Sequence, residues 1–294
     1  MLQIMQVYGT GTDKKVNDMK IKKSIALGLA AGAMVLSQSA GAATAFTWYY
    51  DDDATQGDPI DWNSVSNPIN GNTSISGLSI VDANAWATTG GTFSSAQLWD
   101  YGNYNLAVYT PGSDPVDSSG NPIAPNHAMD NSGASEFVLF EFNQAVALTD
   151  VAIGWPNAGD PYDSDMTFAA YTGAGTPSAL SSRTASDLQS NGWTFRKDVS
   201  NVPQDGGAGC SGNCGSFASI GNSSLVSSKY WLVGAYNSSV GGGLSLTGGD
   251  DYMKIAAFKG SLASPPPPGV PEPASLGLIG LGLLGLRWST RRSR

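Results

Sequence analysis

Short apolar segments separated by turn residues dominate the central part of the chain. Val, Ile, Phe, Tyr, Trp and Thr, which favour strands, fill these segments, and Gly-Gly, Asn-Gly, Asn-Pro, Pro-Gly and Ser-Gly pairs lie between them. The 37 Gly and 16 Pro among 294 residues leave little room for long helices. This pattern predicts an all-β body, an antiparallel β-sandwich or a jelly-roll-like arrangement.

Nine segments carry the strand pattern. They are residues 78–82, 92–99, 105–109, 136–142, 146–155, 166–171, 193–196, 231–235 and 252–262. Both faces of segment 136–142 are mostly apolar, which predicts a central strand covered on each side. A short helix is expected around residues 179–189, and no other segment of the body shows a convincing 3.6-residue period.

Charge separates the body from the two ends of the chain. The net charge is −9, yet nine of the 15 basic residues lie before residue 24 or after residue 286. Residues 46–268 hold 21 acidic residues against six basic ones. Such a body repels phosphate backbones, so the sequence argues against nucleic acid as a partner. It favours solubility outside the cell or the binding of cations.

The N-terminal region has the order of a secretory signal. A basic flank at residues 19–23 precedes an apolar run of 12 residues at 25–36, and small residues follow. The run is too short for an ordinary transmembrane helix. We therefore expect a signal helix within a signal peptide at residues 19–45, and signal peptidase as a partner that removes it.

Two details of this region bear on the mature protein. Small residues at 43–45 fit a cleavage site before Phe46, and residues 40–42 are the alternative site. Residues 1–18 show no apolar periodicity and precede a suitable start at Met19. They are interpreted as an upstream leader from a mis-assigned start, which leaves residues 46–263 as the exported β-domain.

The C-terminal region joins a proline-rich spacer at 264–269 to an apolar run at 274–286 and a cluster of arginines. Thirteen helical residues span about 20 Å, which is short of a hydrocarbon core of ~30 Å. Trp288 and the arginines can reach the interfaces and thin the bilayer locally, so we expect a short transmembrane helix at 274–286. The arginines stay cytoplasmic by the positive-inside rule, which leaves the body outside.

Residues 270–294 resemble a PEP-CTERM sorting signal. The resemblance is carried by Pro271, Glu272 and Pro273, followed by the Gly/Leu-rich run and the terminal arginines. Such tails are read by exosortase, a membrane processing enzyme of Gram-negative bacteria that produce exopolysaccharide. The resemblance implies membrane insertion by the C-terminal helix before processing and cleavage near the Pro-Glu-Pro motif. The body would then reach the cell surface or the extracellular matrix.

A second resemblance lies in the body, where residues 127–173 are similar to a group of exosortase-dependent surface proteins. The shared order is Asp-Asn at 130–131, Glu136, Leu-Phe-x-Phe at 139–142, Ile-Gly-Trp at 153–155, Asp-Ser-Asp at 163–165 and Tyr-Thr-Gly at 171–173. That group has no established chemistry. The resemblance therefore implies a location and no reaction.

Three carboxylates lie close together in the loop at residues 160–165. They are Asp160, Asp163 and Asp165. Hard oxygen ligands on a turn suit Ca²⁺, the candidate cofactor of this chain, and Asp130, Asn131 and Glu136 would add oxygens if the neighbouring loops converge. The alternative is a solvated acidic loop whose aspartates form Asx-turns.

Cys210 and Cys214 are the only cysteines. In an exported chain an even count favours a disulfide, and three intervening residues allow a tight clip. A zinc site needs more nitrogen or sulfur ligands than the single His127 supplies.

Catalytic groups do not stand out. His127 lacks a nucleophile motif such as Gly-x-Ser-x-Gly, and no spacing singles out a carboxylate pair for glycoside hydrolysis. Several aromatic residues could offer a sugar-stacking surface, although most are better explained as core: Trp48, Tyr49, Tyr50, Trp62, Trp86 and Trp99.

The sequence therefore favours a non-enzymatic surface or matrix protein, sorted by exosortase, with a structural or adhesive role within exopolysaccharide. The alternative is a carbohydrate-binding module, calcium-dependent, which needs an exposed row of aromatics beside the calcium site. A secreted hydrolase is the least favoured reading, because it needs a cleft with convergent carboxylates.

Overall fold

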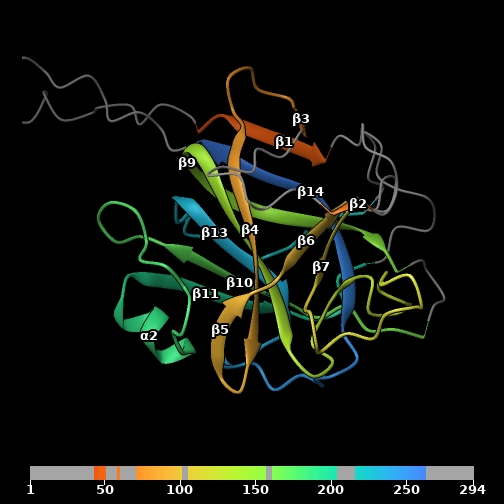
Figure 1. The fold of residues 1–294 in the computed structure, drawn as a ribbon. Coiled ribbons are helices and arrows are strands. Elements are labelled where there is room, and N and C mark those ends of the chain that lie inside the picture. Colours follow the sequence, from red (N-terminus) through yellow and green to blue (C-terminus); the bar gives the residue numbers. More distant parts are fainter. Residues whose placement is uncertain are drawn as a thin grey trace, which may run out of the picture. The chain divides into compact units, whose positions relative to one another are not determined.

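The structure is a computed structural model that describes residues 43–50, 58–59, 71–100, 105–156, 161–203 and 216–262. Within these residues the chain forms an open antiparallel sheet of 14 strands and one six-residue helix (Figure 1). The all-β prediction is confirmed. The finer expectation of an antiparallel β-sandwich or a jelly-roll-like arrangement is not confirmed by this open sheet and stays a prediction.

The strands follow one another along the chain with a single helix among them. They are β1 (Ala45–Tyr50), β2 (Asp58–Pro59), β3 (Gly71–Thr73), β4 (Ile80–Thr89), β5 (Thr92–Ser95), β6 (Gln97–Asp100), β7 (Leu106–Tyr109), β8 (Met129–Asp130), β9 (Ser135–Trp155), β10 (Met166–Tyr171), α2 (Ala185–Ser190), β11 (Trp193–Val199), β12 (Ala218–Ser219), β13 (Ser228–Ala235) and β14 (Tyr252–Leu262). Along the sheet the order is β11-β10-β13-β9-β14-β7-β6-β2.

The long strand β9 connects the two parts of the sheet. Its first half pairs with β4 on one side and β13 on the other, so Phe140 lies opposite both Ala83 and Trp231. Its second half pairs with β14 and with the short β12. The register with β13 jumps between these halves, from Glu141 to Val146, which is the irregularity at which a strand bends. Segments 136–142 and 146–155, predicted as two strands, are thus one.

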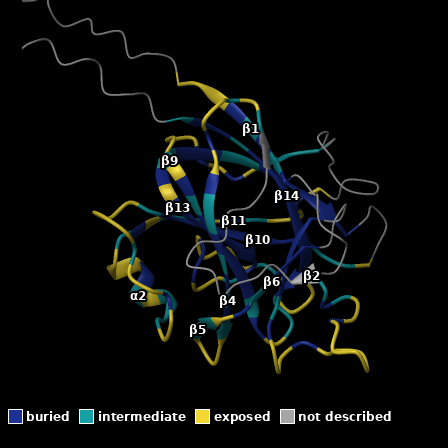
Figure 2. Ribbon diagram, turned by 45° about the horizontal axis from the view of Figure 1, so that its top comes forward, coloured by how far each residue is buried: buried dark blue, intermediate teal, exposed yellow. Residues whose placement is uncertain are grey.

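The prediction that segment 136–142 is covered on both faces is confirmed. Phe140 and Val138 belong to the main core, while Phe137 belongs to a second core that also contains Phe93 and Trp193. In the main core the ring of Phe140 lies 5.2 Å from that of Phe258 in β14. Figure 2 shows the central strands in the colour of buried residues, with exposed residues on turns and on α2. Each such buried side chain contributes about 1.5–3 kcal/mol to folding.

The predicted helix around 179–189 is shorter than expected and lies at the end of that range. Thr184 caps α2: its hydroxyl accepts a hydrogen bond from the backbone N–H of Asp187, and the Asp187 carboxylate accepts one from the backbone N–H of Thr184. This capping box explains why the helix begins there. Among the described residues no helix is long and apolar enough to cross a membrane.

The first and the last strand of the described chain, β1 and β14, lie side by side. β1 and β14 pair with Ala45 opposite Ser261, and the backbone N–H of Leu262 donates to the carbonyl of Thr44 at 2.9 Å. Cleavage before Phe46 would remove Thr44 and Ala45, and with them these two contacts. The alternative cleavage after residue 42 keeps both residues.

Several predicted features lie outside the described residues. They are the leader at 1–18, the signal helix, the spacer at 264–269, the transmembrane helix at 274–286, the motif of Pro271, Glu272 and Pro273, the pair Cys210 and Cys214, and Asp160. They stay predictions here, apart from what the comparisons below show for the tail.

Candidate functional site

Three aspartates from two distant segments gather beside the start of β14. Asp163 precedes β10, while Asp250 and Asp251 precede β14, and one carboxylate oxygen of each lies within 4.8 Å of the others. The backbone N–H of Asp163 donates to the carbonyl of Asp250 at 3.1 Å, and the N–H of Tyr252 donates to the carbonyl of Asp163 at 2.9 Å. These two bonds hold the segments side by side. We call this group the three-aspartate cluster.

Asp251 is the buried member of the cluster, and its neighbours fix it in place. Its carboxylate accepts hydrogen bonds from Asn131 Nδ2 at 2.5 Å and from the backbone N–H of Asp165 at 2.8 Å. Asn131 Oδ1 in turn accepts from the backbone N–H groups of Gly249 and Asp251, at 2.9 and 3.1 Å. Burial raises the pKa of Asp251 to about 7, and the carboxylates of Asp165 and Asp163 add to the rise.

The cluster offers the ligands of a hard divalent cation. Ca²⁺ takes six to eight oxygens from carboxylates, carbonyls and water, in flexible geometry. Asp250 is exposed and Asp163 is partly buried, so an ion could arrive from solvent while Asp251 supplies a fixed ligand from below. A bound cation would also offset the repulsion among the three carboxylates and lower the pKa of Asp251.

The structure brings only part of the predicted calcium site together. Asp163 belongs to the three-aspartate cluster, and Asp160 lies outside the described residues. Asp165 lies beside the cluster: its Oδ1 accepts from the backbone N–H of Asn201 at 2.7 Å, and burial raises its pKa. The prediction missed Asp250 and Asp251. The available signal was the Gly-Gly turn followed by two aspartates directly before an apolar strand.

The expected convergence of the 130–131 loop occurs, but with a different outcome for each residue. Asn131 reaches the three-aspartate cluster, whereas Asp130 and Glu136 form a second group with Asp114. All three carboxyl groups of this second group are buried. We call it the buried carboxyl trio.

Hydrogen bonds within the buried carboxyl trio involve both carboxyl oxygens of Glu136. Oε1 accepts from the Thr110 hydroxyl at 2.5 Å, and Oε2 accepts from the backbone N–H of Asp130 at 3.1 Å. Asp114 Oδ2 accepts from the backbone N–H of Thr110 at 2.5 Å. The trio therefore ties the end of β7, the β8 segment and the start of β9 together.

Burial raises the pKa of all three members of the trio. It raises that of Asp130 to about 8 and that of Glu136 well above its usual range, and the charges of neighbouring carboxylates add to both shifts. The pKa of Asp114 is raised as well, again by burial. At neutral pH Asp130 therefore keeps its proton, which lets its carboxyl group donate a hydrogen bond to a neighbour.

His127 lies against a buried lysine. Its Nδ1 is 2.9 Å from Lys254 Nζ, and the same Nζ lies 4.8 Å from the centroid of the Trp155 ring. Burial lowers the pKa of Lys254 to about 7 and, together with the Lys254 charge, lowers that of His127 to about 4. A neutral imidazole at physiological pH can accept from the lysine through Nδ1 in the tautomer that carries its proton on Nε2.

None of the five candidate sugar-stacking aromatics that the structure describes is exposed. Among the described ones, Trp48, Tyr50 and Trp99 are buried, and Tyr49 and Trp86 are partly buried. Trp62 lies outside the described residues. The carbohydrate-binding alternative therefore needs another surface.

The comparisons with known proteins bear on the C-terminal region. Residues 269–292 match the model of the PEP-CTERM protein-sorting motif, which confirms the resemblance seen in the sequence. No curated protein and no solved structure shows a significant match to the chain. The motif implies an exported protein that is targeted by exosortase and destined for the cell surface.

Proposed function

We propose that this exosortase-targeted chain displays its acidic β-domain as a non-enzymatic, structural or adhesive component of the cell surface or the surrounding exopolysaccharide. The observation that carries the proposal is the sorting motif at residues 269–292. The meeting of β1 and β14 supports it, because the chain enters and leaves the domain at one place.

The proposed route has three steps. Signal peptidase removes the N-terminal signal, and the short apolar helix at 274–286 holds the exported chain in the membrane of a Gram-negative cell. Exosortase then cleaves near Pro271, Glu272 and Pro273 and releases or transfers the domain. The prolines lack backbone N–H donors and keep this segment extended, which places it just outside the helix, within reach of a membrane-embedded enzyme.

A double substitution tests the sorting step. Pro271→Ala/Glu272→Ala should leave the protein exported but uncleaved and retained in the membrane fraction. The matched control, Pro266→Ala/Pro267→Ala, changes the spacer alone and should be processed like wild type. Cell fractionation and the mass of the mature protein report the result. Normal processing of the Pro271→Ala/Glu272→Ala variant would show that the tail is only an anchor.

Direct binding tests the adhesive role. The full-length protein, purified in detergent, should co-sediment with exopolysaccharide from the producing cells and not with an unrelated neutral polysaccharide such as dextran. Equal co-sedimentation with both, or with neither, would contradict an adhesive role in this matrix.

A calcium-dependent carbohydrate-binding module is the second candidate, and the three-aspartate cluster is the observation that favours it. In this reading Ca²⁺ on Asp163, Asp250 and Asp251 stabilises the loop before β14. Co-sedimentation with exopolysaccharide should then fall on addition of EDTA and return with Ca²⁺. Binding that is indifferent to EDTA would leave the first proposal standing and remove the second.

A further inference from the structure

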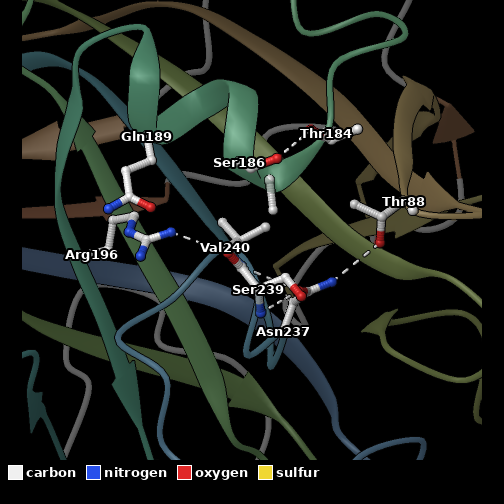
Figure 3. Close-up of a pocket in the computed structure, with 10 residues that line it drawn as sticks. Thr88, Thr184, Ser186, Gln189, Arg196, Asn237, Ser239 and Val240 are labelled. Atoms are coloured by element: carbon white, nitrogen blue, oxygen red, sulfur yellow. Dashed lines mark hydrogen bonds between the residues drawn. The ribbon is translucent and has the colours of Figure 1, made fainter.

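A pocket with a volume of about 480 Å³ is lined by residues that belong to neither carboxylate group (Figure 3). It is lined by the end of β4, by the start of α2 and the residues before it, by β11 and by the loop after β13. Its volume is in the range of small-molecule sites. Neither the sorting motif nor the three-aspartate cluster uses it.

The charge of the pocket is opposite to that of the domain. Arg196 is the charged residue among the lining side chains, which otherwise carry hydroxyl, amide or small apolar groups. Its Nη1 donates to the carbonyl of Ser239 at 3.1 Å, which fixes the guanidinium at the pocket wall. That bond uses one of five N–H donors in the planar fork, a shape that matches a carboxylate.

The neutral groups of the pocket are fixed by hydrogen bonds of their own. Asn237 Oδ1 accepts from the backbone N–H groups of Ser239 and Val240, at 3.0 and 3.3 Å, and Asn237 Nδ2 donates to the Thr88 hydroxyl at 3.3 Å. Thr184 is held by the capping box of α2. A ligand would therefore meet groups already in place, which reduces the entropy lost on binding.

We propose that this pocket binds a carboxylated sugar residue of an acidic polysaccharide. Arg196 pairs with the sugar carboxylate, and Ser186, Gln189 and Asn237 offer hydroxyl and amide groups to the ring hydroxyls. Several neutral hydrogen-bonding groups beside a single arginine suit a ligand with one charge and many hydroxyls. The choice of polysaccharide as the source rests on the proposed surface or matrix function.

Binding of sodium D-glucuronate tests the site directly, with D-glucose as the uncharged comparison. In isothermal titration calorimetry on the full-length protein in detergent, wild type should bind glucuronate at least tenfold more tightly than glucose. Arg196→Gln should lose at least tenfold in affinity for glucuronate. Arg183→Gln is the matched control, because Arg183 lies near α2 but does not line the pocket. It should bind like wild type.

Gln189 lines the pocket and is exposed, so its substitution provides a second variant that should not disturb folding. Gln189→Ala should weaken glucuronate binding severalfold at an unchanged melting temperature. Equal affinity for glucose and glucuronate, no binding at millimolar glucuronate, or full affinity in Arg196→Gln would each overturn the proposal.

Failure of this site and failure of the proposed function give different results. If wild type binds glucuronate but does not co-sediment with exopolysaccharide, the site stands and the adhesive function falls. If Arg196→Gln loses no co-sedimentation and wild type does not bind glucuronate, the adhesive function stands on another surface and this inference falls.

Discussion

The three-aspartate cluster and the buried carboxyl trio use the same chemical group for different ends. In the cluster, Asp250 is open to solvent, and the repulsion of three carboxylates can be relieved by a cation. In the trio, all three residues are buried, and only protons can relieve the repulsion among their carboxylates. Exposure, more than the number of carboxylates, therefore decides whether such a group can respond to an ion or to pH.

The largest expected effect is the pH dependence of the trio. The folded pKa of Asp130 is about 8, and its ordinary value is 3.8, so between these values the folded state keeps a proton that the unfolded state has released. The free energy of unfolding should therefore fall as the pH rises from about 4 to 8, by about 1.4 kcal/mol per pH unit for one whole proton. Urea unfolding at several pH values measures it.

Comparison with Asp130→Asn isolates this contribution. His127 and Lys254 have lowered pKa values and act with the opposite sign, so their effects cancel in the difference between variant and wild type. The slope should be shallower in Asp130→Asn. It should be unchanged above about pH 5 in Asp117→Asn, an exposed control whose lowered pKa confines its own contribution to more acidic pH. Parallel pH curves for wild type and Asp130→Asn would mean that Asp130 is ionised in the fold.

Removal of the central carboxyl group should have the next largest effect. Glu136→Ala leaves the Thr110 hydroxyl and the backbone N–H of Asp130 without their acceptor and opens a cavity. We expect a loss of about 3 kcal/mol in the free energy of unfolding. Glu136→Gln keeps an acceptor and should lower the free energy of unfolding by less than half as much.

Asp250→Ala in the exposed three-aspartate cluster should change the free energy of unfolding by less than about 0.5 kcal/mol without calcium. A larger loss there would remove the contrast between the two groups.

A smaller effect should come from calcium at the three-aspartate cluster. At tenfold excess over the dissociation constant, Ca²⁺ stabilises the fold by about 1.4 kcal/mol, which raises the melting temperature by roughly 3–5 °C. Asp250→Asn should remove most of this shift, and Asp117→Asn should keep it. Calorimetry with and without calcium measures both.

The calcium response should also depend on pH. Because the pKa of Asp251 is about 7, a proton competes with the ion at low pH, so the shift should be larger at pH 8 than at pH 5. An equal shift at both values, or the same shift in Asp250→Asn, would show that calcium binds elsewhere.

Local pattern was enough to predict much of the sheet. Segments 166–171 and 252–262 coincide with β10 and β14, because each is an apolar run between clear turn residues. The continuity of β9 was not predicted, since Asn143 and Gln144 interrupt the apolar pattern as a turn would. Pairing on either side of this interruption, of Phe142 with Ile80 and of Val146 with Ser228 and Leu262, keeps the strand continuous, and that information is not local.

The carboxylates show the same limit. Asp163 was identified from its neighbours in sequence, but its partners in the cluster come from a segment that the bridge between Asp163 and Asp251 brings near. Glu136 stands at the start of a segment that is apolar on both faces, and the packing of β7 and β8 against β9 buries it beside two other carboxyl groups. Long-range pairing, which a single sequence does not reveal, assembles both groups.

The position of β14 has a mechanical consequence for a domain held by its C-terminal end. This strand pairs with β9 along one side and with β1 and β7 along the other, and Leu262 is its last residue. Under a pull on the tail that acts along the strand axis, the hydrogen bonds on both sides carry the load together and must slide before any can open. An external force on the domain, such as fluid flow, would therefore be resisted in shear by the hydrogen bonds of β14 at the point of attachment.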